Sequence, residues 1–294
     1  AMSLWLHEQE IEHDRVFIDT GWEHQATYGY LRGPLTKALG PIIEIKGSSE
    51  LDVPLDSLRP RVRAALQGGS VMVARILRKG MFPSKRRRFC TQETKAFVIR
   101  DFIRTRQDAG EEIINTVGIR AAESAARSQL QEMEWSADLD CEVWRPLITW
   151  SERRVIEIHH RHGLAPNPLY LQGASRVGCW PCIYARKSEI RRIADSDPER
   201  IELLRELEAD VADLAAARYA AKGETFESLG YGRPAFFQAP LGGAGEPWPI
   251  DRVVEWSRTI RGGREEDRQE LLFAAHNDGC MRWGLCDTGS EQKS

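Results

Sequence analysis

The sequence predicts an α/β protein with a twisted, mostly parallel sheet that is flanked by helices. Over the first two-thirds of the 294 residues, short apolar runs alternate with amphipathic stretches. Strands that alternate with helices indicate βαβ units, and therefore parallel strands. After residue 195 the alternation stops and one long helical pattern begins. We therefore expect an α/β domain over residues 1–195 and a helical C-terminal extension over residues 196–294.

The elements of the α/β domain follow from periodicity and from residues that begin or end helices. Ser151 is a suitable N-cap for the helix 151–163, and Gly163 a suitable C-cap. The motif QGGS interrupts a longer helical pattern at residues 67–70. The expected strands are residues 15–19, 41–47, 113–120 and 142–148, and the expected helices are residues 2–12, 22–38, 58–79, 91–106, 121–132 and 151–163.

The C-terminal extension begins with one long helix over residues 197–223. Asp197 is its expected N-cap, Pro198 fits its first turn and Gly223 ends it. A Gly/Pro-rich stretch and two further helical segments follow at residues 229–248, 250–260 and 266–276.

Composition excludes several classes of protein. Hydrophobic residues make up 41% and charged residues 29%, as in ordinary globular proteins. A net charge of −3 argues against a broadly basic nucleic-acid coat, although a local basic patch stays open. No apolar run approaches the roughly 20 residues of a membrane span, and the polar start does not resemble a secretory signal. We expect a cytoplasmic protein with no membrane contact.

Six cysteines lie at positions 90, 141, 179, 182, 280 and 286. In a reducing compartment such cysteines bind metal, carry chemistry or pack inertly in the core. The pair Cys179-Trp-Pro-Cys182 has a spacing that suits one metal or cluster, a dithiol redox couple, or a structural role. Cys141, between acidic residues at a strand start, is expected to be structural.

A run of four cations precedes Cys90 in KRRRFCTQETK (residues 85–95), and Lys95 follows about one helical turn later. Such a run is consistent with a solvated loop. Beside a cysteine, it also suits stabilisation of a thiolate or of an anionic cluster. The cations singled out are Arg86, Arg87, Arg88 and Lys95.

The motif Asp19-Thr20-Gly21 stands at the end of the first expected strand. The carboxyl ends of parallel strands are where open α/β sheets bind ligands. Gly21 permits close approach of a nucleotide to the backbone, and Asp19 and Thr20 offer an acceptor and a hydroxyl. A simple strand-to-helix turn with Thr20 as N-cap explains the same residues.

The motif GIRAAESAAR (residues 118–127) carries two arginines after an expected strand. Gly118 and Arg120 end that strand, and Glu123 and Arg127 follow at helical spacing. The two arginines can face one anion near a helix N-terminus. Alternatively, Glu123 and Arg127 form an ordinary i,i+4 pair on a solvated helix.

Taken together, these stretches resemble the phosphoadenosine phosphosulfate (PAPS) reductase family, within the PP-loop, adenine nucleotide alpha-hydrolase-like superfamily. The matching features lie within residues 1–195 and occur in the family's order. They are IDTGWEHQATY, CTQETK, VGIRAAESAAR, RPLITWSERRVIEIHHRHGLAPNPLY and GASRVGCWPCI. The resemblance implies a mostly parallel sheet that binds ATP or a sulfonucleotide at its strand ends.

The resemblance also implies roles for the residues above. Asp19, Thr20 and Gly21 are expected to line the nucleotide pocket, together with Arg176 beside the cysteine pair. Gly118, Arg120, Glu123 and Arg127 are expected to grip the phosphate or sulfate end of the substrate. The cations at positions 86–88 and 95 would help to neutralise charge that develops there.

The phosphate loop of the family, Ser-Gly-Gly-Lys-Asp-Ser, has no counterpart here. The motifs QGGS (67–70) and RGGR (261–264) stand in the wrong context for it. The start of the chain resembles the helix that normally follows that loop. We therefore expect the loop and the first strand to belong to residues upstream of this sequence.

Cluster-bearing reductases of the family use a Cys-Cys pair and a CxxC motif. Here the first pair is reduced to Cys90, a pattern that also resembles sulfurtransferases of DNA phosphorothioation. The resemblance implies a [4Fe–4S] cluster held by Cys90, Cys179, Cys182 and Cys286, with Cys280 as the alternative fourth ligand and zinc as the alternative metal. The C-terminal Glu-Cys-Gly motif of reductases is absent, since the chain reads WGLCD there.

Three functions follow as hypotheses. The first is reduction of a sulfonucleotide (PAPS or its APS analogue) with a thioredoxin-like reductant. The second is ATP cleavage that adenylates an acceptor, with nucleic acid as one candidate acceptor, before a sulfur donor acts. The third is a non-catalytic, metal-stapled binding module. The sequence predicts no oligomeric state.

Overall fold

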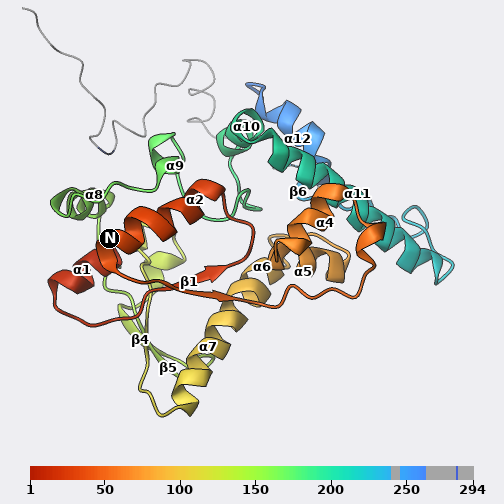
Figure 1. Cartoon of the computed structure of the whole chain (residues 1–294). Helices are drawn as coiled ribbons and strands as arrows, with labels where there is room; N and C mark the ends of the chain where they lie inside the picture. The colour runs from red at the N-terminus through yellow and green to blue at the C-terminus, as the bar shows by residue number, and fades with distance from the viewer. Residues whose placement is uncertain (240–245, 263–282, 284–294) are drawn as a thin grey trace, which may run out of the picture.

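A computed structural model describes residues 1–239, 246–262 and 283 of the chain. Figure 1 shows short strands gathered with some of the helices, next to a group of longer helices. The expected helix at residues 266–276 and the two cysteines Cys280 and Cys286 lie outside the described residues.

The first strands form a parallel pair. Strand β1 (Val16–Asp19) pairs with β2 (Ile43–Lys46), and Asp19 lies opposite Lys46. Parallel strands need a crossover, which here is helical. Helix α1 (Met2–Glu8) precedes the pair, and the crossover consists of α2 (Gln25–Tyr30), the π-helical stretch η1 (Leu31–Leu35) and α3 (Thr36–Leu39). The strand–helix–strand order expected for this part of the chain is confirmed.

A second sheet has the order β3–β5–β4. Strand β5 (Cys141–Trp144) is parallel to β3 (Ile114–Thr116) and antiparallel to β4 (Met133–Ser136). Among the described residues this sheet is not hydrogen-bonded to the β1–β2 pair. The parallel pairings and the flanking helices confirm the predicted α/β class.

Helix α8 (Glu152–Arg161) follows the second sheet, and the Ser151 side chain accepts a hydrogen bond from the Arg154 N–H, as the predicted N-cap requires. Helix α1 packs against α8. Their contact surface is a small apolar core of Leu4, Leu147, Trp150, Ile158 and Leu164.

Two short helices, α4 (Pro60–Gln67) and α5 (Val71–Lys79), follow a 3-10 turn η2 (Leu55–Ser57). The interruption expected at residues 67–70 separates them, and Ser70 caps α5 by accepting from the Val73 N–H at 3.4 Å. The next helical run confirms the helix expected at residues 91–106. It comprises α6 (Phe89–Thr91), the π-helical stretch η3 (Gln92–Ala96) and α7 (Phe97–Asp108).

The remaining elements are mostly helical. The long helix begins after Asp197, whose side chain accepts from the Arg200 N–H at 3.2 Å. The elements are α9 (Pro168–Leu171), α10 (Lys187–Ser196), α11 (Pro198–Ala220), α12 (Ile250–Ser257) and two short paired strands, β6 (Phe237–Gln238) and β7 (Pro247–Trp248).

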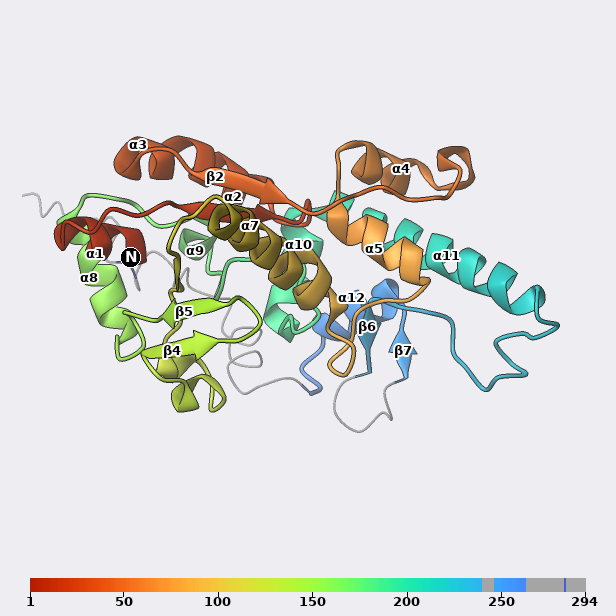
Figure 2. The ribbon, with the colours of Figure 1, turned by 90° about the horizontal axis from the view of Figure 1, so that it is seen from below.

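Helix α11 is the centre of the larger core. It packs against α4, α5, α10 and α12, as Figure 1 and the view from below in Figure 2 both show. Leu204, Leu207 and Val211 of α11 are fully buried, in one apolar cluster with Trp22 and Trp180. The division at residue 195 stays a prediction, and across it the two parts share this core. We call α4, α5 and α10–α12 the helical half, and β1–β5 with α1 and α8 the strand-rich half.

One expected element is wrong. The predicted helix at residues 121–132 is instead a loop with two 3-10 turns, η4 (Ala121–Glu123) and η5 (Arg127–Gln129). The apolar residues of AAESAAR are all alanines, so this stretch has little apolar surface with which tertiary packing can stabilise a helix. Ser124 also accepts a hydrogen bond from the Arg127 N–H at 3.2 Å, a local bond that competes with helix. Strands β4, β6 and β7 were not predicted.

No helix among the residues that the structure describes is both long enough and apolar enough to cross a membrane.

Candidate functional site

The turn at the carboxyl end of β1, here called the β1 turn (residues 19–23), is fixed to the start of α5. The Ser70 hydroxyl donates to the Gly21 carbonyl at 3.0 Å, and the Met72 N–H donates to the Thr20 carbonyl at 3.1 Å. Gly21 has a positive φ of 64°, and a Cβ on it would lie 2.5 Å from the Ser70 Cα. Conformation and space therefore both require glycine at this position.

The Asp19 carboxylate is already engaged within the protein. Its Oδ1 accepts from the Gly21 N–H and from the Tyr28 hydroxyl, each at 2.7 Å, and its Oδ2 lies 3.2 Å from Lys46 Nζ. Burial acts to raise the pKa of Asp19, but these hydrogen bonds and the lysine charge outweigh burial and lower it. Asp19 is ionised and holds the shape of the turn.

Thr20 and Glu23 form a buried polar pair in the β1 turn. The Thr20 hydroxyl lies 2.9 Å from both carboxylate oxygens of Glu23 and donates to them. Glu23 Oε2 also accepts from the Tyr28 hydroxyl at 3.1 Å. Thr20 is not the N-cap of α2, because His24 holds that position and accepts from the Ala26 N–H at 3.0 Å.

The cysteine turn (residues 179–182) packs directly on the β1 turn. Cys179 pairs with Glu23 in an isolated antiparallel bridge, and the Trp180 N–H donates to the Trp22 carbonyl at 3.0 Å. The Trp22 indole N–H donates to the Pro181 carbonyl at 2.9 Å. These bonds join segments that lie about 160 positions apart in the sequence, so the predicted nucleotide motif and the predicted metal motif are neighbours.

Lys95 interacts with Cys179 and Cys182, and Cys90 interacts electrostatically with these two cysteines. The Lys95 Nζ lies 3.7 Å from the Cys179 sulfur and 3.8 Å from Glu23 Oε1. Burial raises the pKa of the Cys179 thiol and the charges of the other two cysteines raise it further, while Lys95 acts to lower it. The structure therefore brings three of the four predicted cluster ligands into mutual electrostatic range.

The charge state of this group follows from burial. Burial raises the pKa of the Cys90 thiol as well. Burial acts to lower the pKa of Lys95. The neighbouring cysteine sulfurs and Glu23 outweigh burial and raise this pKa, so Lys95 keeps its charge. A free nucleophilic cysteine needs a lowered pKa, and burial acts in the opposite direction here.

The basic run at residues 85–88 lies exposed beside these cysteines. The Arg88 guanidinium stacks over the Tyr184 ring, with 5.5 Å between the guanidinium carbon and the ring centre. Among the described residues no carboxylate lies within ion-pair distance of Lys85 or of the three arginines that follow it. The predicted cations at positions 86–88 thus remain available to an anion.

The arginine loop (residues 117–130) contains the other predicted cations. Arg120 Nε lies 3.5 Å from Glu123 Oε1, and Arg127 forms an ion pair with the other carboxylate oxygen. The i,i+4 pair of Glu123 and Arg127, stated above as the alternative, is present, although on a loop and not on a helix. That both arginines bind an anion of the substrate stays a prediction.

Two further predicted residues lie apart from these contacts. A Cβ added to Gly118 would meet only the Met2 side chain, at 3.7 Å or more. Arg176 precedes the cysteine turn, and its Nε lies 3.3 Å from a Glu189 carboxylate oxygen of α10. Neither residue contacts the β1 turn through an ion pair or a side-chain hydrogen bond in the described part of the chain.

Comparison with known proteins identifies the family. A model of the phosphoadenosine phosphosulfate reductase domain matches residues 84–185. An uncharacterized 37.8 kDa protein of Escherichia phage 186 is 34% identical over 95% of this chain and 90% of its own length. The adenosine 5'-phosphosulfate reductase of Allochromatium vinosum is 40% identical over 68 residues, which are 23% of this chain and 27% of that enzyme.

The chain belongs to the PAPS reductase family. The resemblance seen in the sequence is thereby confirmed, and it implies a sulfonucleotide-related enzyme. The matched region includes the basic run, Cys90, Lys95, the arginine loop and the cysteine turn. The β1 turn and the whole helical half lie outside it.

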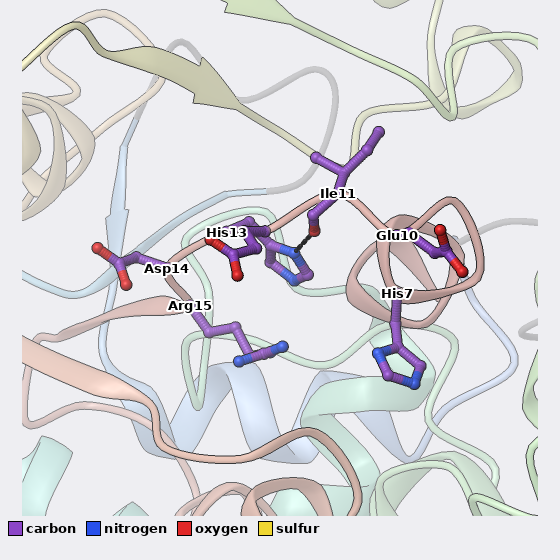
Figure 3. Close-up of a pocket in the computed structure, with 7 residues that line it drawn as sticks. His7, Glu10, Ile11, His13, Asp14 and Arg15 are labelled. Atoms are coloured by element: carbon purple, nitrogen blue, oxygen red, sulfur yellow. Dashed lines mark hydrogen bonds between the residues drawn. The ribbon is translucent and has the colours of Figure 1, made fainter.

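A surface hollow of about 720 Å³ lies at the opposite, amino end of β1 (Figure 3). It is lined by His7 and residues 10–15, and His13 Nδ1 lies 2.8 Å from the Ile11 carbonyl. None of the residues predicted from the sequence to act in the site lines this hollow. Because open α/β sheets bind ligands at the carboxyl ends of their strands, the β1 turn is the better candidate for the nucleotide site.

The described donors form no preformed metal site. In residues 1–239, 246–262 and 283, no group of three or more His, Cys, Asp or Glu side chains is arranged to hold a metal ion. Cys90, Cys179 and Cys182 belong to these residues, so neither zinc nor a cluster has a preformed site there. An iron–sulfur cluster takes four thiolates, and three of the predicted four are described. The donor chemistry suits a cluster, and the predicted fourth ligand lies in the part of the chain that is not described.

Sequence reasoning missed Glu23, Tyr28 and Lys46. Each of these residues bonds to Asp19 or Thr20, or supports a partner that does. Glu23 and Tyr28 stand in the motif IDTGWEHQATY that carried the resemblance, but their spacing alone does not assign them a partner. Lys46 is found only through the strand pairing that sets it opposite Asp19.

Proposed function

We propose that this chain is an iron–sulfur enzyme that reduces an adenine sulfonucleotide between the β1 turn, the cysteine turn and the arginine loop. The observation that carries the proposal is the contact between the β1 turn and the cysteine turn, with Lys95 beside both. Membership of the PAPS reductase family supports the same substrate class.

In this proposal the β1 turn offers its backbone to the nucleotide. The Asp19 and Thr20 side chains already have partners inside the turn. Their role is to hold the turn in one shape, with Gly21 packed against Ser70 where a Cβ would not fit. Lys95 and the cations at positions 86–88 neutralise the anionic end of the substrate.

The proposed cluster ligands are Cys90, Cys179 and Cys182, with Cys286 or Cys280 as the fourth. A buried thiol with a raised pKa is a poor free nucleophile, whereas a thiol bound to a metal centre is deprotonated outright. The half-buried Cys90 and Cys179 therefore fit ligands better than attacking groups. A cluster held by four thiolates would be anionic, and the Lys95 ammonium beside Cys179 would offset part of that charge.

Reduction of a sulfonucleotide to sulfite needs two electrons. We assign their supply to an external dithiol protein of the thioredoxin kind, which leaves the reaction as a disulfide. One thiolate of the dithiol attacks the sulfur, and the nucleoside phosphate departs as its S–O bond breaks. The second thiol then displaces sulfite and closes the disulfide.

One observation favours a second candidate, ATP-dependent sulfur transfer. The C-terminal motif reads WGLCD where reductases carry Glu-Cys-Gly. In that reaction the α-phosphate of ATP is attacked, an acceptor such as a nucleic acid is adenylated and pyrophosphate leaves. Sulfur from a donor then displaces AMP.

Product analysis tests the proposal. Protein purified without oxygen is incubated with ATP, or with adenosine 5'-phosphosulfate and a reduced dithiol protein of the thioredoxin kind, and the products are identified. Sulfite from the sulfonucleotide is the expected result. If ATP is instead converted to AMP and pyrophosphate, the reduction hypothesis is rejected in favour of ATP-dependent sulfur transfer.

Two cysteine variants supply the matched control. Cys179→Ser is expected to abolish both visible absorbance and product formation. Cys141→Ser is expected to preserve both, because Cys141 is buried in β5 and does not belong to the three-cysteine group. A colourless protein that contains stoichiometric zinc and forms no product would exclude both enzymatic hypotheses and support the non-catalytic binding module.

A further inference from the structure

The Glu123 carboxylate lies between the two arginines of the arginine loop. Arg120 Nε lies 3.5 Å from one carboxylate oxygen, and Arg127 Nη1 is paired with the other. The resemblance to the PAPS reductase family implies that these two arginines grip the phosphate or sulfate end of the substrate. In the structure they are held by a carboxylate of the same loop.

The two ends of this arrangement differ in how firmly they are fixed. Backbone bonds on either side of Arg120 tie the loop to the end of the second sheet, from the Val117 N–H to the Trp144 carbonyl at 2.9 Å and from the Ala121 N–H to the Ile148 carbonyl at 2.8 Å. The Arg120 side chain is 19% exposed. Arg120 is therefore a fixed cation that lies mostly inside the surface.

In the part of the chain that the structure describes, the Glu123–Arg127 side is held by bonds within the loop itself. The Ser128 N–H donates to the Ser124 carbonyl at 3.0 Å, and the Leu130 N–H donates to the Arg127 carbonyl at 3.2 Å. The side chains of Glu123 and Arg127 are 30% and 45% exposed. Solvent reaches this ion pair, so separating its charges costs little, on the order of 1 kcal/mol or less for an exposed pair.

Charge decides which anion the arginines prefer. Glu123 brings one negative charge, and Arg120 with Arg127 brings two positive ones, so the group as a whole carries one net positive charge. A phosphate, sulfate ester or pyrophosphate group brings more charge or more acceptor oxygens, and arginine binds such groups in bidentate fashion. A singly charged carboxylate ligand has no such advantage over Glu123.

We propose that Glu123 occupies the anion position of the Arg120–Arg127 pair in the unliganded enzyme and that the multiply charged phosphate or sulfate end of the substrate displaces it. The proposal rests on the proposed function for the identity of the substrate. The consequence is ligand selectivity: polyanionic esters displace Glu123 and bind the two arginines, whereas carboxylates and other monoanions do not.

The direction in which one substitution changes ligand affinity tests the proposal. Glu123→Gln removes the internal competitor and keeps the size of the side chain. Binding of pyrophosphate and of adenosine 5'-phosphosulfate is measured by titration calorimetry at constant ionic strength. The expected result is tighter binding by about three- to tenfold, which corresponds to one or two exposed ion pairs. In turnover assays KM falls by the same factor.

The matched control is Glu157→Gln, which breaks another exposed i,i+4 ion pair, with Arg153 of α8. It is expected to leave both affinities unchanged. Acetate and succinate serve as carboxylate probes, and Glu123→Gln is expected to let them compete with pyrophosphate, whereas the wild type excludes them.

Weaker binding in Glu123→Gln would overturn the proposal, because it would mean that Glu123 orients the arginines for the ligand. Unchanged binding would overturn it as well. Pyrophosphate binding tests this inference independently of the proposed function. If the wild type binds pyrophosphate but not the sulfonucleotide, the proposed function fails while the effect of Glu123→Gln on pyrophosphate still decides the inference.

Discussion

The cysteine turn and the arginine loop are the two predicted motifs of the site, and the protein holds them in opposite ways. The cysteine turn is fixed by buried packing, since Trp22 and Trp180 belong to the large core. The arginine loop is stabilised by ion pairs that solvent reaches. Buried contacts contribute far more to stability than exposed ion pairs do. Changes at the cysteine turn should therefore act on folding, and changes in the arginine loop on ligand affinity.

The largest expected effect comes from Trp22→Ala. Trp22 is fully buried, its ring stacks on Phe236 with 5.8 Å between centroids, and its indole N–H bonds to the cysteine turn. Loss of this side chain is expected to lower the free energy of unfolding by about 3–5 kcal/mol, as measured by denaturant titration. Trp135→Ala in β4 is the control, because Trp135 is 63% exposed and should change stability by about 0.5 kcal/mol or less. Similar losses in both variants would refute the contrast.

The next effect is a pH dependence centred on Glu208 of α11. Its carboxylate accepts from the Phe236 and Ile250 N–H groups, each at 2.9 Å, and so fastens the start of α12 to α11. Burial raises the pKa of Glu208 from an ordinary 4.5 to about 7, although the two N–H groups act to lower it.

Because this pKa is raised, the folded state holds the proton more tightly than the unfolded state does. The contribution of Glu208 to stability is complete below pH 4.5 and is lost as the pH rises to about 7, by roughly 3 kcal/mol. Glu208→Gln should remove this slope in thermal or urea unfolding at several pH values. Glu157→Gln, at an exposed position, should keep it. A slope that survives Glu208→Gln would assign the dependence to another group.

The third prediction concerns the glycines of the two turns. Gly21→Ala sets a Cβ against the Ser70 backbone at a positive φ, which is expected to cost roughly 1–3 kcal/mol or more. Gly178→Ala, one residue before the cysteine turn, meets no atom within 4 Å and does not have a positive φ. It should leave the melting temperature nearly unchanged. If the two alanines cost the same, the β1 turn is not fixed as described.

The fourth prediction tests the electrostatics of the cysteine group. Lys95→Met removes the charge 3.7 Å from the Cys179 sulfur, so the pKa of that thiol should rise further above its ordinary value. Alkylation of the metal-free protein, followed across pH by peptide mass spectrometry, measures this pKa. Lys85→Met takes the same charge from the exposed run and serves as control. Equal titration of Cys179 in wild type and Lys95→Met would exclude the role of Lys95.

The smallest effect is expected in the arginine loop. Arg127→Gln should change the free energy of unfolding by about 0.5 kcal/mol or less, because the pair with Glu123 is exposed. Arg59→Gln is the contrasting variant, since it removes the partner of the buried Asp210 and should cost more than about 1 kcal/mol. A larger loss for Arg127→Gln than for Arg59→Gln would contradict the comparison.

Much of the fold follows from local sequence. The strands at β1 and β2, the caps Ser151 and Asp197, and the break before α5 were all predicted from residue type and spacing. Alternating strands and helices were enough to predict the α/β class. The arginine loop was not predicted correctly, because helix propensity favoured AAESAAR while a helix there has little apolar surface to bury.

The sequence by itself determined which residue types stand at the strand ends, and through them the family. It could not determine partners. Three sets of partners are known only from the folded chain. Glu23 accepts a hydrogen bond from Thr20, Lys46 forms an ion pair with Asp19, and Glu123 forms ion pairs with both arginines. The physical reason is that a motif fixes spacing along the backbone, whereas hydrogen bonds and charges act through space between segments that are distant in sequence. The contact between the β1 turn and the cysteine turn, on which the proposed function depends, is of this kind.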